Sequence, residues 1–346
     1  MESMQRFLKL RNRFHKKLLY TLVVCMGFAC QTYLQAATEP LPTPLNLSTA
    51  LSFAKDHPRT KLTAEQSLLF PVPQPLFLGC HNLIFNNSSI SDPKRNNNET
   101  GLIDPVTQQE LLILQAYFDV LLADSSLIGI NEELAGSFIR YDRAKTRQDL
   151  KEFSELYVAR LDAEYQEVRQ QFFSGRATQR FTRSVLAQAI NHPDDLSSDL
   201  TPPNLIKSPK TLPEANDLYK EALKNNPWIE QLRKNSSAEQ IALYEMALRQ
   251  QILEMKLRLD ILIAAGDRAE SNAYSKDLDL ELSRTLYEME VNATLGRSMT
   301  LQSMARMEEE RVKYCRTLTW ARLNALTGKP ILTQPALDKE PEETNQ

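Results

Sequence analysis

Glycine and histidine are both scarce in this sequence, and their scarcity excludes several classes of enzyme. The chain has nine glycines in 346 residues, with no glycine-rich phosphate-binding loop and no Gly-x-Ser-x-Gly nucleophile turn. The four histidines (His15, His57, His81 and His192) are scattered, and none belongs to a His-Glu-x-x-His zinc motif. We therefore expect no enzyme activity, no cofactor and no metal site.

Long apolar runs are also few, and one near the N-terminus is typical of a secretory signal. Leu18–Ala29 follows a basic segment and precedes Leu34-Gln35-Ala36-Ala37, which fits a signal-peptide cleavage site. The run is shorter than the ~20 residues that a spanning helix needs. Export with a cleaved signal peptide over residues 1–37 is therefore favoured over the alternative, an uncleaved membrane anchor. No other run is expected to span a membrane as a helix.

Excess positive charge is absent from the rest of the chain. The full sequence has a net charge of −3, and residues 1–37 carry six basic side chains against one acidic, so the exported part is more acidic still. An acidic body does not favour nucleic acid as a partner. Two cysteines remain after cleavage, Cys80 and Cys315, and their distant positions neither require nor exclude a disulfide.

The abundant residues predict an all-α fold dominated by long antiparallel coiled-coil hairpins. Leu, Glu, Gln, Ala, Arg and Lys fill the long middle segments, and these residues lose little rotamer freedom in a helix. One face of the expected helix within 154–190 carries apolar residues at spacings of three and four, and polar residues fill the other face. These apolar residues are Tyr157, Leu161, Tyr165, Val168 and Phe172.

Changes in composition divide the chain into five parts. After the signal, residues 38–193 form a first helical unit, in which a helix from Ser48 to about Leu69 is capped by Ser48 and broken at Pro58. Residues 71–105 are a loop whose only strand candidate is Leu76–Phe85. A linker at 194–213, a second helical unit at 214–330 and a disordered tail at 331–346 complete the division.

The two helical units carry matching residues in the same order, which indicates a duplicated unit. Ala222–Pro227 matches Phe53–Pro58, and Thr327–Pro330 matches Ile190–Pro193. Leu295–Met299 matches Leu150–Ser154 less closely. The register of apolar residues shifts around Leu150–Ser154, and Ser154 can cap a helix, so a tight helix-to-helix turn is expected there. The second unit has its own apolar seam at Leu248, Ile252, Met255, Leu259 and Leu262.

This order of segments resembles the TolC-like outer-membrane efflux protein family. The resemblance covers nearly all of the exported chain, and it rests on the two-unit plan together with Ala222–Pro227, Gln115–Leu122, Ala321–Gly328 and the stretch Ser154–Pro203. It implies a homotrimer that forms a periplasmic tunnel leading into an outer-membrane barrel, with a periplasmic adaptor and an inner-membrane transporter as partners. The ends of the hairpins would meet the adaptor. The corresponding residues here are Leu150, Lys151 and Ser154 in the first unit and Leu295, Gly296 and Ser298 in the second.

Two departures from that family leave the function open. Lys151 stands where the family usually has a glycine, so it would obstruct the docking surface or change the partner; the alternative is an ordinary helical turn without a partner. Each family unit also inserts a pair of spanning strands of ~9 to 11 residues, and the second unit offers no such pair. The sequence thus predicts an outer-membrane or periplasmic tunnel component for passive efflux or type I secretion. The alternative is a barrel-less periplasmic coiled-coil scaffold or a degenerate, non-transporting relative.

Overall fold

The computed structural model describes residues 41–62, 66, 77–80, 101–192, 199–209, 211–289 and 295–335. The chain divides into Met1–Leu41 and Pro42–Gln346, and the elements below all belong to the second unit. The predicted signal peptide, most of the predicted loop at 71–105, nearly all of the strand candidate Leu76–Phe85 and the tail beyond 335 lie outside the described residues. Their predictions stay untested.

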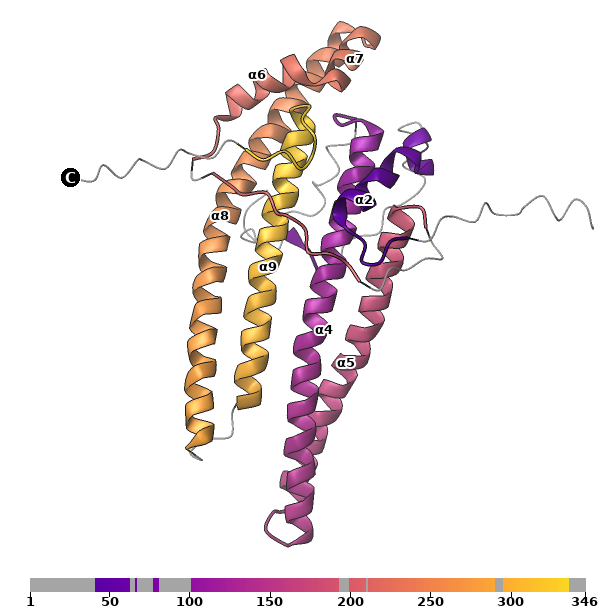
Figure 1. Cartoon of the computed structure of the whole chain (residues 1–346). Coiled ribbons are helices and arrows are strands. Elements are labelled where there is room, and N and C mark those ends of the chain that lie inside the picture. Colours follow the sequence, from indigo (N-terminus) through magenta and orange to yellow (C-terminus); the bar gives the residue numbers. More distant parts are fainter. Residues whose placement is uncertain are drawn as a thin grey trace, which may run out of the picture. The chain divides into compact units, whose positions relative to one another are not determined.

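The described residues are helical almost throughout, which confirms the predicted all-α fold (Figure 1). Four long helices dominate: α4 (Pro105–Asp149), α5 (Glu155–Ala189), α8 (Ala238–Glu288) and α9 (Leu295–Leu326). The short elements are α2 (Leu47–Ser52), η1 (Phe53–Asp56), η2 (Pro58–Lys61), α6 (Ala215–Asn225) and α7 (Pro227–Asn235). In this part of the chain the extended backbone forms no strand, only a parallel bridge between Leu45 and Leu200.

The predicted helix from Ser48 to about Leu69 is broken at Pro58 as expected, but its predicted cap is wrong, and most of 63–69 lies outside the described residues. The region forms three short helical pieces, and Asn46 rather than Ser48 caps the first of them. The Asn46 side-chain oxygen accepts hydrogen bonds from Thr49 N at 2.8 Å and from Ser48 Oγ at 2.7 Å. His57 is extended because a proline follows it, which ends one piece and starts the next.

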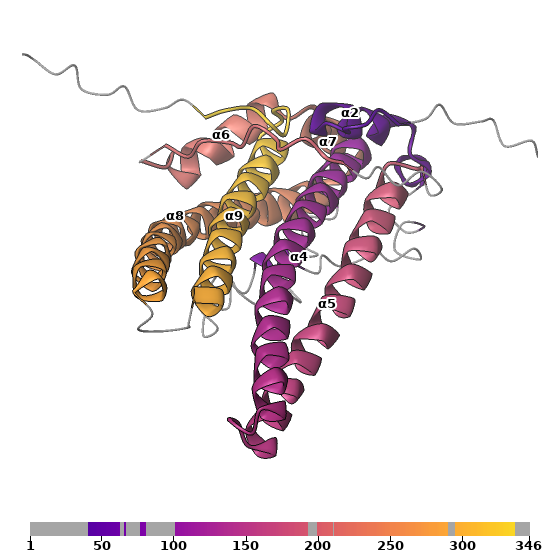
Figure 2. The same cartoon turned by 60° about the horizontal axis from the view of Figure 1, so that its bottom comes forward.

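The long helices pack as two antiparallel hairpins, α4 with α5 and α8 with α9. The hairpins join through α4 and α9, so the helices lie side by side in the order α5, α4, α9, α8, in both views (Figures 1 and 2). The outer helices α5 and α8 do not pack against each other to close a bundle. The structure is therefore an open layer of four helices.

Helix α4 is the centre of the core. It is the one described helix that is long and apolar enough to cross a membrane, but more than half of its apolar window is buried inside the protein. Its first half supplies Ile113, Leu114, Tyr117, Phe118 and Leu122, each fully buried. The expectation that no further run reaches the composition of a spanning helix was wrong for α4, because a core helix of this length meets the same criterion.

The bases of the two hairpins are built alike. At the end of α5, Asn191 N donates to Gln188 O and His192 N donates to Ala187 O; at the end of α9, Gly328 N donates to Ala325 O and Lys329 N donates to Asn324 O. Both pairs follow the Schellman pattern, in which the residue after the cap is left-handed. Asn191 has φ 60° and Gly328 has φ 76°.

The short helices approach these bases in matching ways. His57 Nε2 lies 3.1 Å from Gln188 O, and Asn226 Nδ2 donates to Leu326 O at 2.9 Å. Each of these two side chains also accepts a hydrogen bond from a backbone N–H just after the proline that follows it. The matching residues therefore occupy matching places at the two bases.

Candidate functional site

The far end of the first hairpin is a tight turn that contains Leu150, Lys151 and Ser154. Helix α4 ends at Asp149 with a third Schellman arrangement, in which Lys151 N donates to Gln148 O at 2.8 Å and Glu152 N donates to Arg147 O at 2.9 Å. Lys151 has φ 62°, a left-handed conformation that glycine adopts more readily. Ser154 caps α5 by accepting a hydrogen bond from Tyr157 N at 3.3 Å.

This turn presents apolar side chains to its surroundings. Leu150 is 67% exposed and Leu156, in the first turn of α5, is 63% exposed. Phe153 packs edge-on against Tyr157, and the Arg147 guanidinium lies 5.5 Å from the Phe153 ring centroid. The end of the first hairpin therefore offers leucine side chains beside a pair of rings packed edge to face.

The predicted turn at Leu295–Met299 is misplaced, because these residues are the first turns of helix α9. The connection lies before Leu295 and includes residues 290–294, outside the described ranges. Gly296 is helical because it packs against α4: a Cβ added at Gly296 would lie 3.8 Å from Gly136 Cα. Ser298 Oγ lies 2.6 Å from Ser283 Oγ on α8.

The two hairpins do not reach equally far. Gly296, at the start of α9, lies beside Gly136, and α4 continues from there to Asp149. At 1.5 Å per residue, this part of α4 adds about 20 Å. The first hairpin extends beyond the second in both views (Figures 1 and 2). The six predicted docking residues therefore do not share one level: those of the first unit lie at the turn of the longer hairpin, and those of the second unit lie in the first turns of α9.

The seam between α4 and α9 is made of small residues and two matching hydrogen bonds. A Cβ added at Gly129 would lie 3.2 Å from Ser303 Cβ, and Gly136 faces Gly296 seven residues along. Ser125 Oγ donates to Glu310 at 2.9 Å, and Ser303 Oγ donates to Glu132 at 2.8 Å. Close helix approach through small side chains buries little apolar area, so this seam is weaker than the leucine-rich contacts inside each hairpin.

A short segment crosses the α4–α9 contact at the other end of the seam. Cys80 forms a disulfide with Cys315 of α9, which answers the question that the sequence left open. On the α4 side, the Asp119 carboxylate accepts hydrogen bonds from Phe77 N at 2.7 Å and Leu78 N at 3.0 Å. The Phe118 and Tyr314 rings stack within this contact, with centroids 4.6 Å apart.

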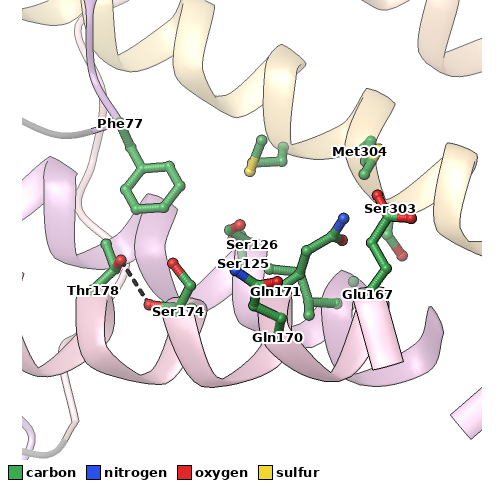
Figure 3. Close-up of a pocket in the computed structure, with 14 residues that line it drawn as sticks. Phe77, Ser125, Ser126, Glu167, Gln170, Gln171, Ser174, Thr178, Ser303 and Met304 are labelled. Carbon is green, nitrogen blue, oxygen red and sulfur yellow. Dashed lines mark hydrogen bonds between the residues drawn. The ribbon is translucent and has the colours of Figure 1, made fainter. Parts of the chain in front are cut away.

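A cavity of about 550 Å³ lies between α4, α5 and α9 (Figure 3). Its α5 wall is polar, its α9 wall includes Ser303 and Met304, and Phe77 stands at one end. Within the described ranges there is no group of three or more His, Cys, Asp or Glu that could hold a metal ion. The polar α5 residues are Glu167, Gln170, Gln171, Ser174 and Thr178.

These features define an all-α protein of two joined coiled-coil hairpins. No protein-family model and no curated protein matches the chain. Among solved structures, a membrane protein from Pseudomonas aeruginosa is similar at 11% identity with a TM-score of 0.49, over 67% of this chain and 68% of that one. A structure of CusC, described in terms of folding and transmembrane channel formation, is similar at 12% identity with a TM-score of 0.48, over 82% and 95%. Likenesses this distant do not assign a function to this chain.

Proposed function

We propose that this chain is the tunnel component of an outer-membrane or periplasmic export system. In this proposal a signal peptide exports the chain, three copies form the tunnel, and solutes pass through it passively in efflux or type I secretion. A periplasmic adaptor meets the hairpin ends, and an inner-membrane transporter supplies the energy. Support comes from the ordered sequence motifs and from the open edges of the helical layer.

The outer edge of α8 carries large apolar side chains that stay exposed among the described residues. Leu248, Ile252, Met255 and Leu259 are buried, whereas Met246, Leu253, Leu257 and Leu282 are 68%, 40%, 38% and 59% exposed. At 100° per residue, the exposed set lies opposite the buried set. Helix α8 therefore has two apolar seams, of which one is uncovered.

The outer edge of α5 is of a complementary kind. On the side opposite α4 it has exposed small residues, Ala159, Ala163 and Ala177, and the rings of Phe173 and Phe181, which are 55% and 51% exposed, lie on either side of Ala177. Large side chains of one helix pack into the spaces between small ones of another. The α8 edge of one copy therefore fits the α5 edge of the next. Such a head-to-tail contact ends only when a ring closes.

This uncovered pair of unlike edges is the observation that carries the proposal. It is tested by fractionating cell envelopes, washing them with carbonate or urea, and running the retained protein on an unheated gel. We expect wash-resistant trimer for the native chain and for Asn272→Glu, an exposed control on the flank of α8. The double variant Leu253→Glu, Leu257→Glu should run as a helical monomer. A trimer that survives this double variant contradicts the edge assignment.

The alternative is a periplasmic coiled-coil scaffold without a barrel, and one observation favours it. Phe77–Cys80 falls in the region where the family inserts its first pair of strands, and it is bound to α4 and α9. A washable native protein that runs as a monomer or dimer would support this alternative and contradict the tunnel.

A further inference from the structure

The segment Phe77–Cys80 is attached to both hairpins at once. On the α9 side, the Cys80–Cys315 disulfide is joined by hydrogen bonds from the Arg311 guanidinium to Leu78 O at 3.3 Å and Gly79 O at 3.4 Å. On the α4 side, one carboxylate oxygen of Asp119 accepts two backbone N–H groups. The Leu78 side chain is 1% exposed. The segment is thus a bridge of four residues between two helices of different hairpins.

The rest of the contact between the hairpins is weak by comparison. From Ser125 to Gly136, α4 meets α9 through glycines, serines and two Ser–Glu hydrogen bonds. Hydrogen bonds between a neutral and a charged group stabilise such a contact only modestly, and less where water reaches them. The Cys80–Cys315 disulfide lies at the other end of the seam, where the larger Phe118 and Tyr314 side chains pack against each other.

We infer that the Cys80–Cys315 disulfide is a redox-sensitive clip that holds the two hairpins together along α4 and α9. Oxidation fixes the segment to α9, and Asp119 transmits that attachment to α4. Reduction leaves the segment bound to α9 only through the long hydrogen bonds from Arg311, and the small-residue seam then opens and closes more freely. This inference does not depend on the tunnel proposal, because it concerns a contact within one chain.

The two sulfurs differ in accessibility, which sets the route of reduction. Cys315 is 0% exposed, whereas Cys80 is partly exposed. A dithiol reagent, as its thiolate, attacks Cys80 Sγ; the Sγ–Sγ bond breaks, and its electron pair leaves on Cys315 Sγ, which takes up a proton. The second thiolate of the reagent then displaces Cys80 as a thiol, and the reagent leaves as a cyclic disulfide. Because the first leaving sulfur is buried, reduction of the folded chain should be slow.

The test is hydrogen–deuterium exchange of the full exported chain at a temperature well below its unfolding. Four proteins are compared: the oxidised native chain, the same chain reduced with dithiothreitol, the double variant Cys80→Ser, Cys315→Ser, and Asp119→Ala. In the last three we expect about tenfold or greater acceleration in seam peptides covering 125–137 of α4 and 296–310 of α9. Peptides covering 248–262 of α8, inside the second hairpin, should not change.

A disulfide that only restricts the unfolded chain would lower the melting temperature without altering native-state exchange along the seam. Unchanged seam exchange in the reduced native chain would therefore overturn the inference, even if the cysteine variant failed to fold. Seam protection that survives Asp119→Ala would show that the clip does not reach α4. Gln109→Ala is the matched control, because it removes a hydrogen bond from a buried side chain of α4 to Ala189 O at the end of α5 without touching the clip, and its seam should exchange as in the native chain.

Discussion

The two hairpins are alike at their bases and different at their far ends. At each base, a left-handed residue follows the last long helix, and the polar side chain of a short helix's cap reaches the carbonyl three residues before it, Gln188 O or Ala325 O. At the far ends, α4 and α5 extend about 20 Å beyond the start of α9. A base held by backbone hydrogen bonds tolerates little change in chain length, whereas a far end without neighbours in the monomer tolerates more.

The largest effect is expected from exchanging the left-handed residues at the bases. A Cβ at Gly328 would lie 2.6 Å from Asn226 Cα and 2.7 Å from Asn225 O, at φ 76°. Gly328→Ala should therefore lower the free energy of unfolding by about 3 kcal/mol, from left-handed strain and overpacking together. Asn191→Ala, at the matching place in the first hairpin, should cost about 1 kcal/mol. Urea unfolding midpoints measure both, and equal losses would contradict the closer packing of Gly328 against Asn225 and Asn226.

A smaller effect is expected where the segment 199–209 is tied to each hairpin. Tyr117 Oη donates to Thr201 O at 2.6 Å and lies 2.8 Å from Leu45 O, whereas Trp320 Nε1 donates to Ser208 Oγ at 2.6 Å. Tyr117→Phe should cost about 1–2 kcal/mol, and Trp320→Phe about 1 kcal/mol. The contribution of the Tyr117 hydrogen bonds is also sensitive to high pH. Burial raises the pKa of Tyr117 to about 12.

Because the folded-state pKa of Tyr117 lies above the ordinary value, the neutral phenol stabilises the fold. That contribution is complete below about pH 10 and is lost as the pH rises towards 12. The native chain should therefore lose about 2 kcal/mol more than Tyr117→Phe over this interval. Unfolding curves at pH 9 and pH 11.5 give the comparison, and parallel losses in the two proteins would exclude Tyr117 as the cause.

The turn of the first hairpin should become more stable when its left-handed residue is replaced by glycine. Lys151 is exposed, so Lys151→Gly removes left-handed strain and little else. The expected gain is about 0.5–1 kcal/mol, since glycine also adds entropy to the unfolded chain. Thermal unfolding measures the gain. Within the proposed function, cross-linking of the turn to an adaptor before and after this substitution tests docking, and unchanged cross-linking would argue against Lys151 as a contact.

The smallest expected effect is a difference in acid sensitivity between the bases of the two hairpins. His57 Nδ1 accepts a hydrogen bond from Arg59 N at 3.2 Å, so a proton on Nδ1 would oppose that N–H. Partial burial lowers the pKa of His57 below its ordinary value of 6.5. Its contribution is therefore present above about pH 6.5 and is lost as the pH falls through the lowered pKa. The matching Asn226 does not titrate.

His57→Asn copies the second base into the first and should remove this acid sensitivity, worth less than about 1 kcal/mol because the ring is half exposed. Hydrogen exchange of peptides at 186–192 and 323–329 at pH 7 and pH 5 measures it. In the native chain, only the peptides at 186–192 should exchange differently at the two pH values. In His57→Asn, neither set of peptides should show this difference. An equal response of both sets would point to a cause shared by the two bases.

Much of the helical fold could be predicted from the sequence, because long helices show apolar residues at regular spacings of three and four. The turn at Leu150–Ser154 is visible as a shift of register with a capping serine. Gly296 misled the prediction, since a glycine can mark a turn or a close helix contact, and only the partner Gly136 distinguishes them. Seven-residue spacing of Gly129 and Gly136 in a glycine-poor chain was a usable signal. The disulfide and Asp119 were not predictable, because their partners are 235 and about 41 residues away.

The contact between Gly136 and Gly296 marks where the second hairpin begins beside the first. The two backbones meet there directly, and a Cβ added at either glycine would lie 3.8 or 3.9 Å from the Cα of the other. The distance by which the first hairpin projects is then set by the number of residues beyond this point alone. The parts of α4 and α5 beyond this contact make up the projecting end of the first hairpin. A seven-residue insertion in each of these two helices would lengthen that end and leave the Gly136–Gly296 contact in place.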